Sequence, residues 1–171
     1  MSSVFDSCEI KIVKYLPHHR NACKELLCQL QEHLVKVDDE NVQTMNEDYN
    51  DKYIGYIEQQ TRKCDGLILV AEAYDNPVGM IAGLIEKKDE VDSLTNRCPR
   101  RGIITELVVD EKMRGHGIGK KLIERMEAHF KNNNCEFIAV DVFAPNKSAQ
   151  WFYFSLGYSP RNIELYKRVK Y

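Results

Sequence analysis

The chain has 171 residues, of which 43% are apolar and 29% charged, and a formal net charge of −2. This composition is that of an ordinary soluble globular protein, and the near-zero charge gives no reason to expect nucleic acid or an anionic membrane as a partner. The length favours one domain over residues 1–171.

Three further patterns narrow the class of protein. No apolar run approaches the roughly 20 residues of a membrane-spanning helix, and the N-terminus lacks the basic start and apolar stretch of a secretory signal. The six cysteines include no C-x-x-C pair and have no zinc-site spacing. We therefore expect a cytoplasmic protein without a metal ion. The sequence leaves a homodimer open.

The first half of the chain predicts a strand, two amphipathic helices and two paired strands, at 9–15, 18–36, 49–62, 66–74 and 77–88. Alternating charged and apolar residues predict the first strand, and Pro17 ends it. Apolar residues at helical spacing predict the two helices. A turn at Asp75-Asn76 joins the paired strands.

The second half predicts an exposed loop at 89–101 and then alternating strands and helices, at 102–110, 118–131, 136–143, 146–156 and 161–169. The helix over 118–131 has a continuous apolar face, formed by Ile118, Leu122, Ile123, Met126 and Phe130. The asparagines at 132–134 end it, since asparagine tolerates the left-handed conformation. The strand-helix-strand unit over 103–143 predicts two parallel neighbouring strands, and hence an α/β fold with a mixed sheet covered by helices.

The turn "RGHGIGK" at 114–120 joins a predicted strand to a predicted helix. Its glycines allow close approach of a ligand, and a helix N-terminus favours a phosphate. A nucleotide P-loop would need glycine at 114 and serine or threonine at 121, where the chain has Arg114 and Lys121. The dinucleotide fingerprint fails at its third glycine. A tight turn without a ligand stays open at this point.

The same turn resembles the acetyl-coenzyme A signature of the GNAT superfamily of N-acetyltransferases, [QR]-x-x-G-x-[GA], at Arg114, Gly117 and Gly119. Downstream, residues 146–158 resemble the family's N-x-x-A-x-x-F-Y-x-x-x-G-[FY], at Asn146, Ala149, Phe152, Tyr153, Gly157 and Tyr158. The strong similarity covers about 102–158. Glu111 departs from the family, where many members have proline.

The resemblance implies a mostly antiparallel mixed sheet with one parallel pair splayed at the cofactor site and helices on both faces. It implies acetyl-CoA as acetyl donor, with the pyrophosphate held by the backbone N–H groups of Arg114, Gly115, His116, Gly117, Ile118, Gly119 and Lys120. The pantetheine arm is expected along Leu107, Val108 and Val109. Asn146 is expected to contact the pantetheine or to cap its helix, and the two roles are compatible.

Glu106 is the candidate general base, since a carboxylate among apolar strand residues has a raised pKa that suits proton abstraction. A glutamate on a wet sheet face is the alternative. Tyr153 aligns with the family tyrosine that protonates the leaving thiolate, whereas by itself "WFYF" at 151–154 has the pattern of an aromatic core face. No cysteine lies in the matched motifs, so direct transfer without an acetyl-enzyme is expected.

The acceptor is expected to be an amine. Residues 38–51 contain six acidic residues and no lysine or arginine, and in the superfamily this region borders the acceptor. An acidic rim would attract a polyamine, an amino sugar or a lysine-bearing peptide; a solvated loop is the alternative. The leading hypothesis is an acetyl-CoA-dependent N-acetyltransferase. The alternatives are a non-catalytic acyl-CoA-binding regulatory module and, weakened by the failed motifs, a nucleotide-binding protein.

Overall fold

The structure, a computed structural model, describes residues 9–87, 94, 97 and 99–169. The chain divides into two compact units, residues 1–141 and 142–171. The described part of the first unit contains five strands, β1 Ile10–Lys14, β2 Leu67–Ala73, β3 Asn76–Ile85, β4 Arg101–Val109 and β5 Phe137–Val140. Its helices are η1 Pro17–His19, α1 Arg20–Val37, α2 Tyr49–Lys63, η3 Glu111–Met113 and α3 Ile118–Asn132. The second contains α4 Lys147–Ser155.

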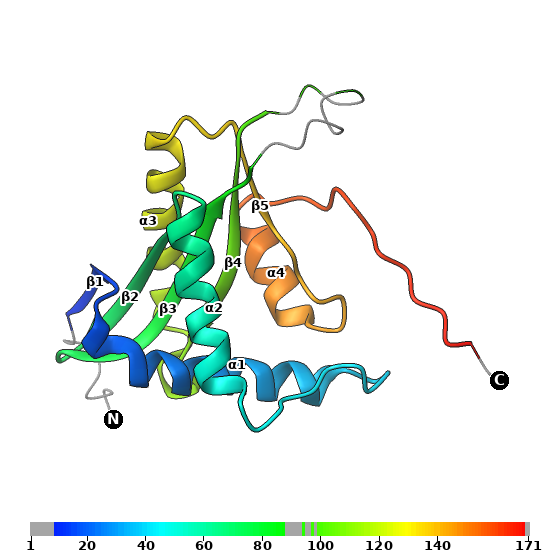
Figure 1. The fold of residues 1–171 in the computed structure, drawn as a ribbon, viewed down its shortest axis with the longest axis horizontal. Helices are drawn as coiled ribbons and strands as arrows, with labels where there is room; N and C mark the ends of the chain where they lie inside the picture. The colour runs from blue at the N-terminus through cyan, green and yellow to red at the C-terminus, as the bar shows by residue number, and fades with distance from the viewer. Residues whose placement is uncertain (1–8, 88–93, 95–96, 98, 170–171) are drawn as a thin grey trace. The chain divides into compact units, whose positions relative to one another are not determined.

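The five strands form one mixed sheet in the order β1-β2-β3-β4-β5. The first four are antiparallel neighbours, and β4 and β5 are parallel. This confirms the predicted mixed sheet and the parallel pair of strands that α3 connects (Figure 1). The described helices include none with the length and apolar character needed to cross a bilayer.

Helices α1 and α2 cover one face of the sheet (Figure 1). They bury Cys23, Leu26 and Leu27 of α1 and Ile54 and Ile57 of α2 against alternate residues of the strands, Ile68, Val70, Met80, Ala82 and Val108. The apolar residues recur at helical spacing on the helices and at a period of two on β2 and β3, so each element presents one apolar face to this core.

Helix α3 covers the opposite face of the sheet. All five apolar residues predicted for its inner face are buried, Ile118, Leu122, Ile123, Met126 and Phe130. The fully buried ring of Phe130 lies on Gly83 and Gly102, where a Cβ atom would come within 2.7 Å and 2.3 Å of ring carbons. The helix ends as predicted at the asparagines, and Asn134 takes a left-handed φ of 58°.

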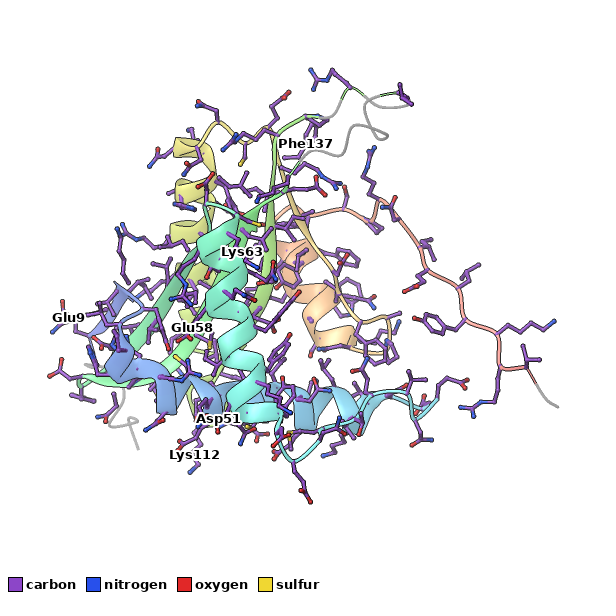
Figure 2. All side chains as sticks on the ribbon, viewed as in Figure 1. Glu9, Asp51, Glu58, Lys63, Lys112 and Phe137 are labelled. Carbon is purple, nitrogen blue, oxygen red and sulfur yellow. The ribbon has the colours of Figure 1, made fainter. Side chains whose placement is uncertain are left out.

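Polar contacts join α1, α2 and Tyr15, the residue after β1. Glu58 of α2 accepts a hydrogen bond from Tyr15 at 2.7 Å and an ion-paired hydrogen bond from Arg20. Burial alone would raise the pKa of Glu58, but the hydrogen bonds from Arg20 and Tyr15 outweigh it and lower that pKa. Nearer the start of α2, Asp51, which is labelled in Figure 2, pairs with Lys24 of α1 at 2.7 Å. The position of α2, which carries part of the candidate site, is therefore fixed by charge as well as by packing.

In the second unit, α4 forms as predicted. The Asn146 side chain accepts a hydrogen bond from the Ala149 N–H at 3.2 Å and so caps the helix. Gly157 follows the helix with a φ of 89°, a left-handed conformation that favours glycine.

Two sequence predictions differ from the structure or fall outside it. The strand predicted over 161–169 is wrong, because these residues have no strand pairing and are exposed. Alternation alone does not provide the partner that a strand requires. The loop predicted over 89–101 lies mostly outside the described residues, and its last residue, Arg101, begins β4.

The contact between Phe130 and the sheet leads to a stability prediction. Gly102→Ala is expected to lower the free energy of unfolding by about 2–3 kcal/mol, since the new methyl group overpacks a closed core. Gly55→Ala is the control, because Gly55 lies inside α2 and has room for a methyl group. The nearest atom to a Cβ at this position is Arg20 Nη2, at 3.8 Å. That variant should be neutral or up to about 1 kcal/mol more stable. Urea unfolding measures both, and equal stabilities would contradict the proposed close packing.

Candidate active site

A β-bulge in β4 determines which way Glu106 points. Ala82 of β3 is opposite Glu106, but the next residue, Gly83, is opposite Ile104, so Thr105 is an extra residue. On one side of the bulge Gly102 faces α3, and on the other Val108 belongs to the core beneath α1 and α2. Without the extra residue, positions 102, 106 and 108 would share a face. The bulge therefore turns Glu106 away from α3 and toward α2.

Glu106 is half-buried and accepts a hydrogen bond from the hydroxyl of Tyr53 on α2 at 2.5 Å. Burial raises the pKa of Glu106 from its ordinary 4.5 to about 7, and the hydrogen bond from Tyr53 offsets part of that rise. A carboxyl with this pKa is about half ionised at neutral pH and can take up a proton there. Its surroundings are buried, as the sequence predicts, and are not those of a glutamate on a wet sheet face.

The edge of β4 beside Glu106 lacks a strand partner in the described part of the chain. The parallel pairing with β5 ends at Ile104 and Val140, whereas β4 continues to Val109. The Asp110 N–H bonds to β3, so by the alternation of a strand the backbone groups of Leu107 and Val109 point to the opposite, open edge. This is the splay predicted for the parallel pair.

The three strand residues predicted to line the cofactor thus differ. Leu107 and Val109 present backbone N–H groups to the open edge. Val108 has its side chain in the core beneath α1 and α2, and by the same alternation its backbone faces β3. The carbonyl of Val109 accepts a hydrogen bond from Arg114 Nε at 3.2 Å, which ties the glycine turn to the end of this edge.

The backbone of the turn at 114–120 has a geometry that suits the binding of an anion. Gly115 and Gly117 have left-handed φ values of 81° and 74°, and a Cβ on either would meet nothing within 4 Å. Helix α3 begins at Ile118, and its first intrahelical hydrogen bond is from the Lys121 N–H to Gly117. The N–H groups of Ile118, Gly119 and Lys120 precede that bond and are available to a ligand.

The polar side chains of this turn, Arg114, His116 and Lys120, are exposed. His116 is held locally, with its Nδ1 2.9 Å from the Arg114 carbonyl oxygen, and Lys120 lies 3.9 Å from Glu124 on the exposed face of α3. Neither contact directs these side chains at a reacting group.

The two downstream site residues belong to the other compact unit. Asn146 caps α4, which is one of the two roles predicted for it. Tyr153 is buried on α4, and its ring packs edge-on to Tyr158 with centroids 5.5 Å apart. Glu106 lies in the unit 1–141 and Tyr153 in the unit 142–171.

A pocket of about 360 Å³ lies at the start of α2 and the segment before it, and the sequence interpretation did not identify it. It is lined by Thr44, Asn46, Asp48, Tyr49, Lys52, Tyr53 and Tyr56. The three tyrosines follow one another at positions i, i+4 and i+7, a spacing that places them on one side of a helix. That spacing was the available signal. Tyr53 connects the pocket to Glu106, because its ring lines the pocket and its hydroxyl bonds the carboxylate.

The acidic segment 38–51 is less of a rim than its composition indicates. Asp38 is buried and accepts hydrogen bonds from the N–H groups of Glu40, Val42 and Gln43, so it shapes the loop. Asp48 and Asp51 pair with Lys52 and Lys24 at 2.6 Å and 2.7 Å. At least three of the six acidic residues therefore have structural or ion-pair partners.

One group of metal-ligating side chains occurs among the described residues, formed by His18, His19 and Glu72. Both ring nitrogens of the buried His19 are already bonded within the protein. Its Nδ1 accepts from the Leu16 N–H at 2.9 Å, and its Nε2 lies 3.0 Å from a Glu72 oxygen. This arrangement stabilises the start of α1, and it leaves no His19 lone pair for a metal ion.

Comparison with known proteins agrees with this geometry. A model of the acetyltransferase (GNAT) family matches residues 34–158, which include parts of both compact units. Glucosamine 6-phosphate N-acetyltransferase 1 of Oryza sativa subsp. japonica is 30% identical over 105 residues, 59% of this chain and 58% of that protein. The corresponding enzyme of Arabidopsis thaliana is 33% identical over 84 residues, 49% of this chain and 51% of that protein. The aligned parts thus span little more than half the length of these relatives.

Solved structures share the fold. The glucosamine-6-phosphate N-acetyltransferase of Arabidopsis thaliana has a TM-score of 0.66 at 25% identity, and the match covers 95% of this chain and 99% of that one. An aminoglycoside N-acetyltransferase in complex with CoA has a TM-score of 0.72 at 17% identity, with 98% and 99% covered. The predicted fold class is confirmed.

Proposed function

Because the chain belongs to the acetyltransferase (GNAT) family, whose model matches residues 34–158, we propose that it transfers an acetyl group from acetyl-CoA to a primary amine. The observation that carries this proposal is Glu106. A bulge turns it toward the tyrosine pocket, burial raises its pKa to about 7, and it lies beside the unpaired edge of β4. A proton acceptor, an open strand edge and an anion cradle on one β-α segment suit thioester aminolysis.

The donor is held through backbone groups in this proposal. The N–H groups at the start of α3 bind the pyrophosphate of acetyl-CoA, and the pantetheine arm pairs with β4 at Leu107 and Val109. Asn146 and the remainder of the downstream motif, which match the family in register, complete the donor site. The donor is a substrate, and no metal ion takes part in the proposed chemistry.

The reaction then follows from three groups. Glu106 removes a proton from the acceptor ammonium, and the amine nitrogen attacks the thioester carbon. A backbone N–H of β4 at the open edge stabilises the tetrahedral oxyanion. As the C–S bond breaks, Tyr153 donates its proton to the leaving thiolate. The nitrogen of the intermediate gives up its second proton, which restores the Tyr153 hydroxyl, and Glu106 releases its proton to solvent, so the products are an amide, free CoA and one proton. Transfer is direct, without an acetyl-enzyme.

The test is acetyl transfer itself. The protein is incubated with acetyl-CoA and a panel of polyamines, amino sugars, arylalkylamines and lysine peptides, and released thiol is measured. Turnover with at least one amine is expected. CoA binding by calorimetry without transfer to any of these amines would instead support the acyl-CoA-binding module.

The pKa of Glu106 predicts the pH profile of the wild-type protein. The base must be ionised to act, so kcat/KM should rise with pH through an inflection near 7. Ionisation of a lysine-like acceptor amine occurs near pH 10.4 and is resolved from it, so the profile is measured with such an acceptor. Steady-state kinetics from pH 5.5 to 9 measure the profile; a kcat/KM that stays level between pH 5.5 and 8 would mean that the base is a solvated carboxylate, ionised throughout this range.

A further inference from the structure

We propose that the acceptor is a cationic primary amine that has a ring-shaped body and carries no phosphate, and that it binds in the pocket lined by Tyr49, Tyr53 and Tyr56. This inference rests on the proposed acetyl transfer and specifies its second substrate. It is carried by the rings and charges of the pocket.

The tyrosines form one stacked wall. The rings of Tyr49 and Tyr53 have centroids 4.9 Å apart and are inclined by 21°, and those of Tyr53 and Tyr56 are 6.3 Å apart and inclined by 18°. Tyr49 and Tyr53 are half-buried and pack against the core beneath α2, while Tyr56 is 55% exposed. The inner rings are thus fixed by packing and the outer one is open to a ligand. Aromatic faces bind flat rings by stacking and cations through the ring quadrupole.

The charges of the pocket favour a cation. Glu106 lies behind Tyr53 and contributes to raising the pKa of both Tyr49 and Tyr53, although burial is the larger cause for each. Its negative field therefore reaches both inner rings of the wall. An ammonium group in this pocket meets tyrosine side chains, and the Glu106 carboxylate lies behind Tyr53.

A phosphate has no comparable partner. Lys52 is the one cationic side chain among the described residues that line the pocket, and it pairs with Asp48 at 2.6 Å. A phosphate entering the pocket would compete with Asp48 for Lys52 and would face the field of Glu106. The two plant relatives are named for glucosamine 6-phosphate, so the acceptor proposed for this chain differs from theirs in charge.

The volume fits a single ring. At about 360 Å³ the pocket is near the lower end of the roughly 300–1,000 Å³ found for small-molecule sites. One ring with a short amine arm has room in such a space. The proposal therefore specifies a monocyclic amine as the occupant.

Two pairs of acceptors test the two halves of the proposal. Glucosamine and glucosamine 6-phosphate differ in the phosphate alone, and kcat/KM should be at least about tenfold higher for glucosamine, a step of about 1.4 kcal/mol. 2-Phenylethylamine and n-hexylamine carry apolar bodies that differ in the flat ring, and the ring should be preferred by about three- to tenfold. A preference for glucosamine 6-phosphate overturns the charge assignment, and equal use of the second pair overturns the ring assignment.

Substitutions in the pocket test whether it is the source of the ring and charge preferences. Tyr56→Leu should lower kcat/KM for 2-phenylethylamine by about three- to tenfold with a smaller change for n-hexylamine. Tyr74→Leu, at an exposed tyrosine in the β2–β3 turn, should alter neither. Asp48→Asn releases Lys52 and should shift the glucosamine 6-phosphate to glucosamine ratio by about threefold or more toward the phosphate. Glu47→Gln, which removes the same charge one residue away, should not.

The failure of this inference is distinguishable from that of the proposed function. If amines are acetylated but the preferences are reversed, or if Tyr56→Leu and Tyr74→Leu behave alike, the acceptor assignment is overturned and the transferase stands. If acetyl-CoA binds but none of the four amines or the wider panel is acetylated, the transferase is overturned, and the acceptor assignment with it.

Discussion

Glu106→Gln is expected to lower kcat by about 100- to 10,000-fold, the range for loss of a positioned general base. The amide keeps the shape of the carboxyl and a hydrogen-bond partner for Tyr53, but it takes up no proton at neutral pH. Binding of acetyl-CoA should change by less than about threefold, because the proposed donor contacts are backbone groups of β4 and the glycine turn. Single-turnover kinetics and CoA calorimetry separate the two quantities.

The same variant is expected to lose activity but not stability. Between pH 4.5 and about 7, folded Glu106 retains a proton that the unfolded chain has released, so this group lowers stability as pH rises through that window. The shift corresponds to about 3 kcal/mol in full. Glu106→Gln should therefore be at least as stable as the wild type at pH 8, and the advantage should shrink toward pH 5.

Urea unfolding at the two pH values measures this difference. Glu58→Gln is a contrasting variant, because the pKa of Glu58 is lowered by its partners and its ionised form supports the fold. That variant should be less stable than the wild type at pH 8. If Glu106→Gln unfolds at pH 8, its loss of activity would report on folding and the assignment of the base would fail.

Elements with a complete apolar face were predictable from the sequence. Helix α3 is the clearest case, since all five inner residues and the end at the asparagines follow from spacing and residue type. The strand predicted at 161–169 shows the limit. Its alternation describes one face of a strand, but pairing depends on another strand that local sequence does not specify, and residues such as Ile163 and Leu165 are exposed.

The candidate site was predictable where the chain makes it locally. The glycine turn and the cap at Asn146 depend on residues a few positions apart, so their motifs describe them fully. The bulge at Thr105 has no glycine or proline to mark it, and it arises from the pairing of β3 with β4. The bond between Tyr53 and Glu106 joins residues 53 positions apart. Glu106 was thus identifiable as a candidate base, whereas its direction and the pocket it serves required the fold.

Tyr153→Phe is expected to lower kcat by about 100-fold, near the low end of the range for acid–base groups. The ordinary pKa of a thiol is near 8.5, so a thiolate leaves more readily than an alkoxide, even when it is not protonated. An ammonium, by contrast, cannot attack until it has lost a proton. Loss of the acid should therefore lower the rate less than loss of the base. The variant keeps the aromatic ring, which is buried on α4 beside Tyr158, and so should keep its fold.

Tyr158→Phe is the matched control, because it removes a hydroxyl from the neighbouring ring at a motif position where the family accepts phenylalanine. It should retain kcat within about twofold, a change of less than 0.5 kcal/mol in the barrier. If kcat falls equally in the two variants, both hydroxyls have a structural role and Tyr153 is not the acid. Full activity of Tyr153→Phe would mean that the thiolate leaves without an acid, and the glycine turn, the open edge of β4 and Glu106 would then suffice for the transfer.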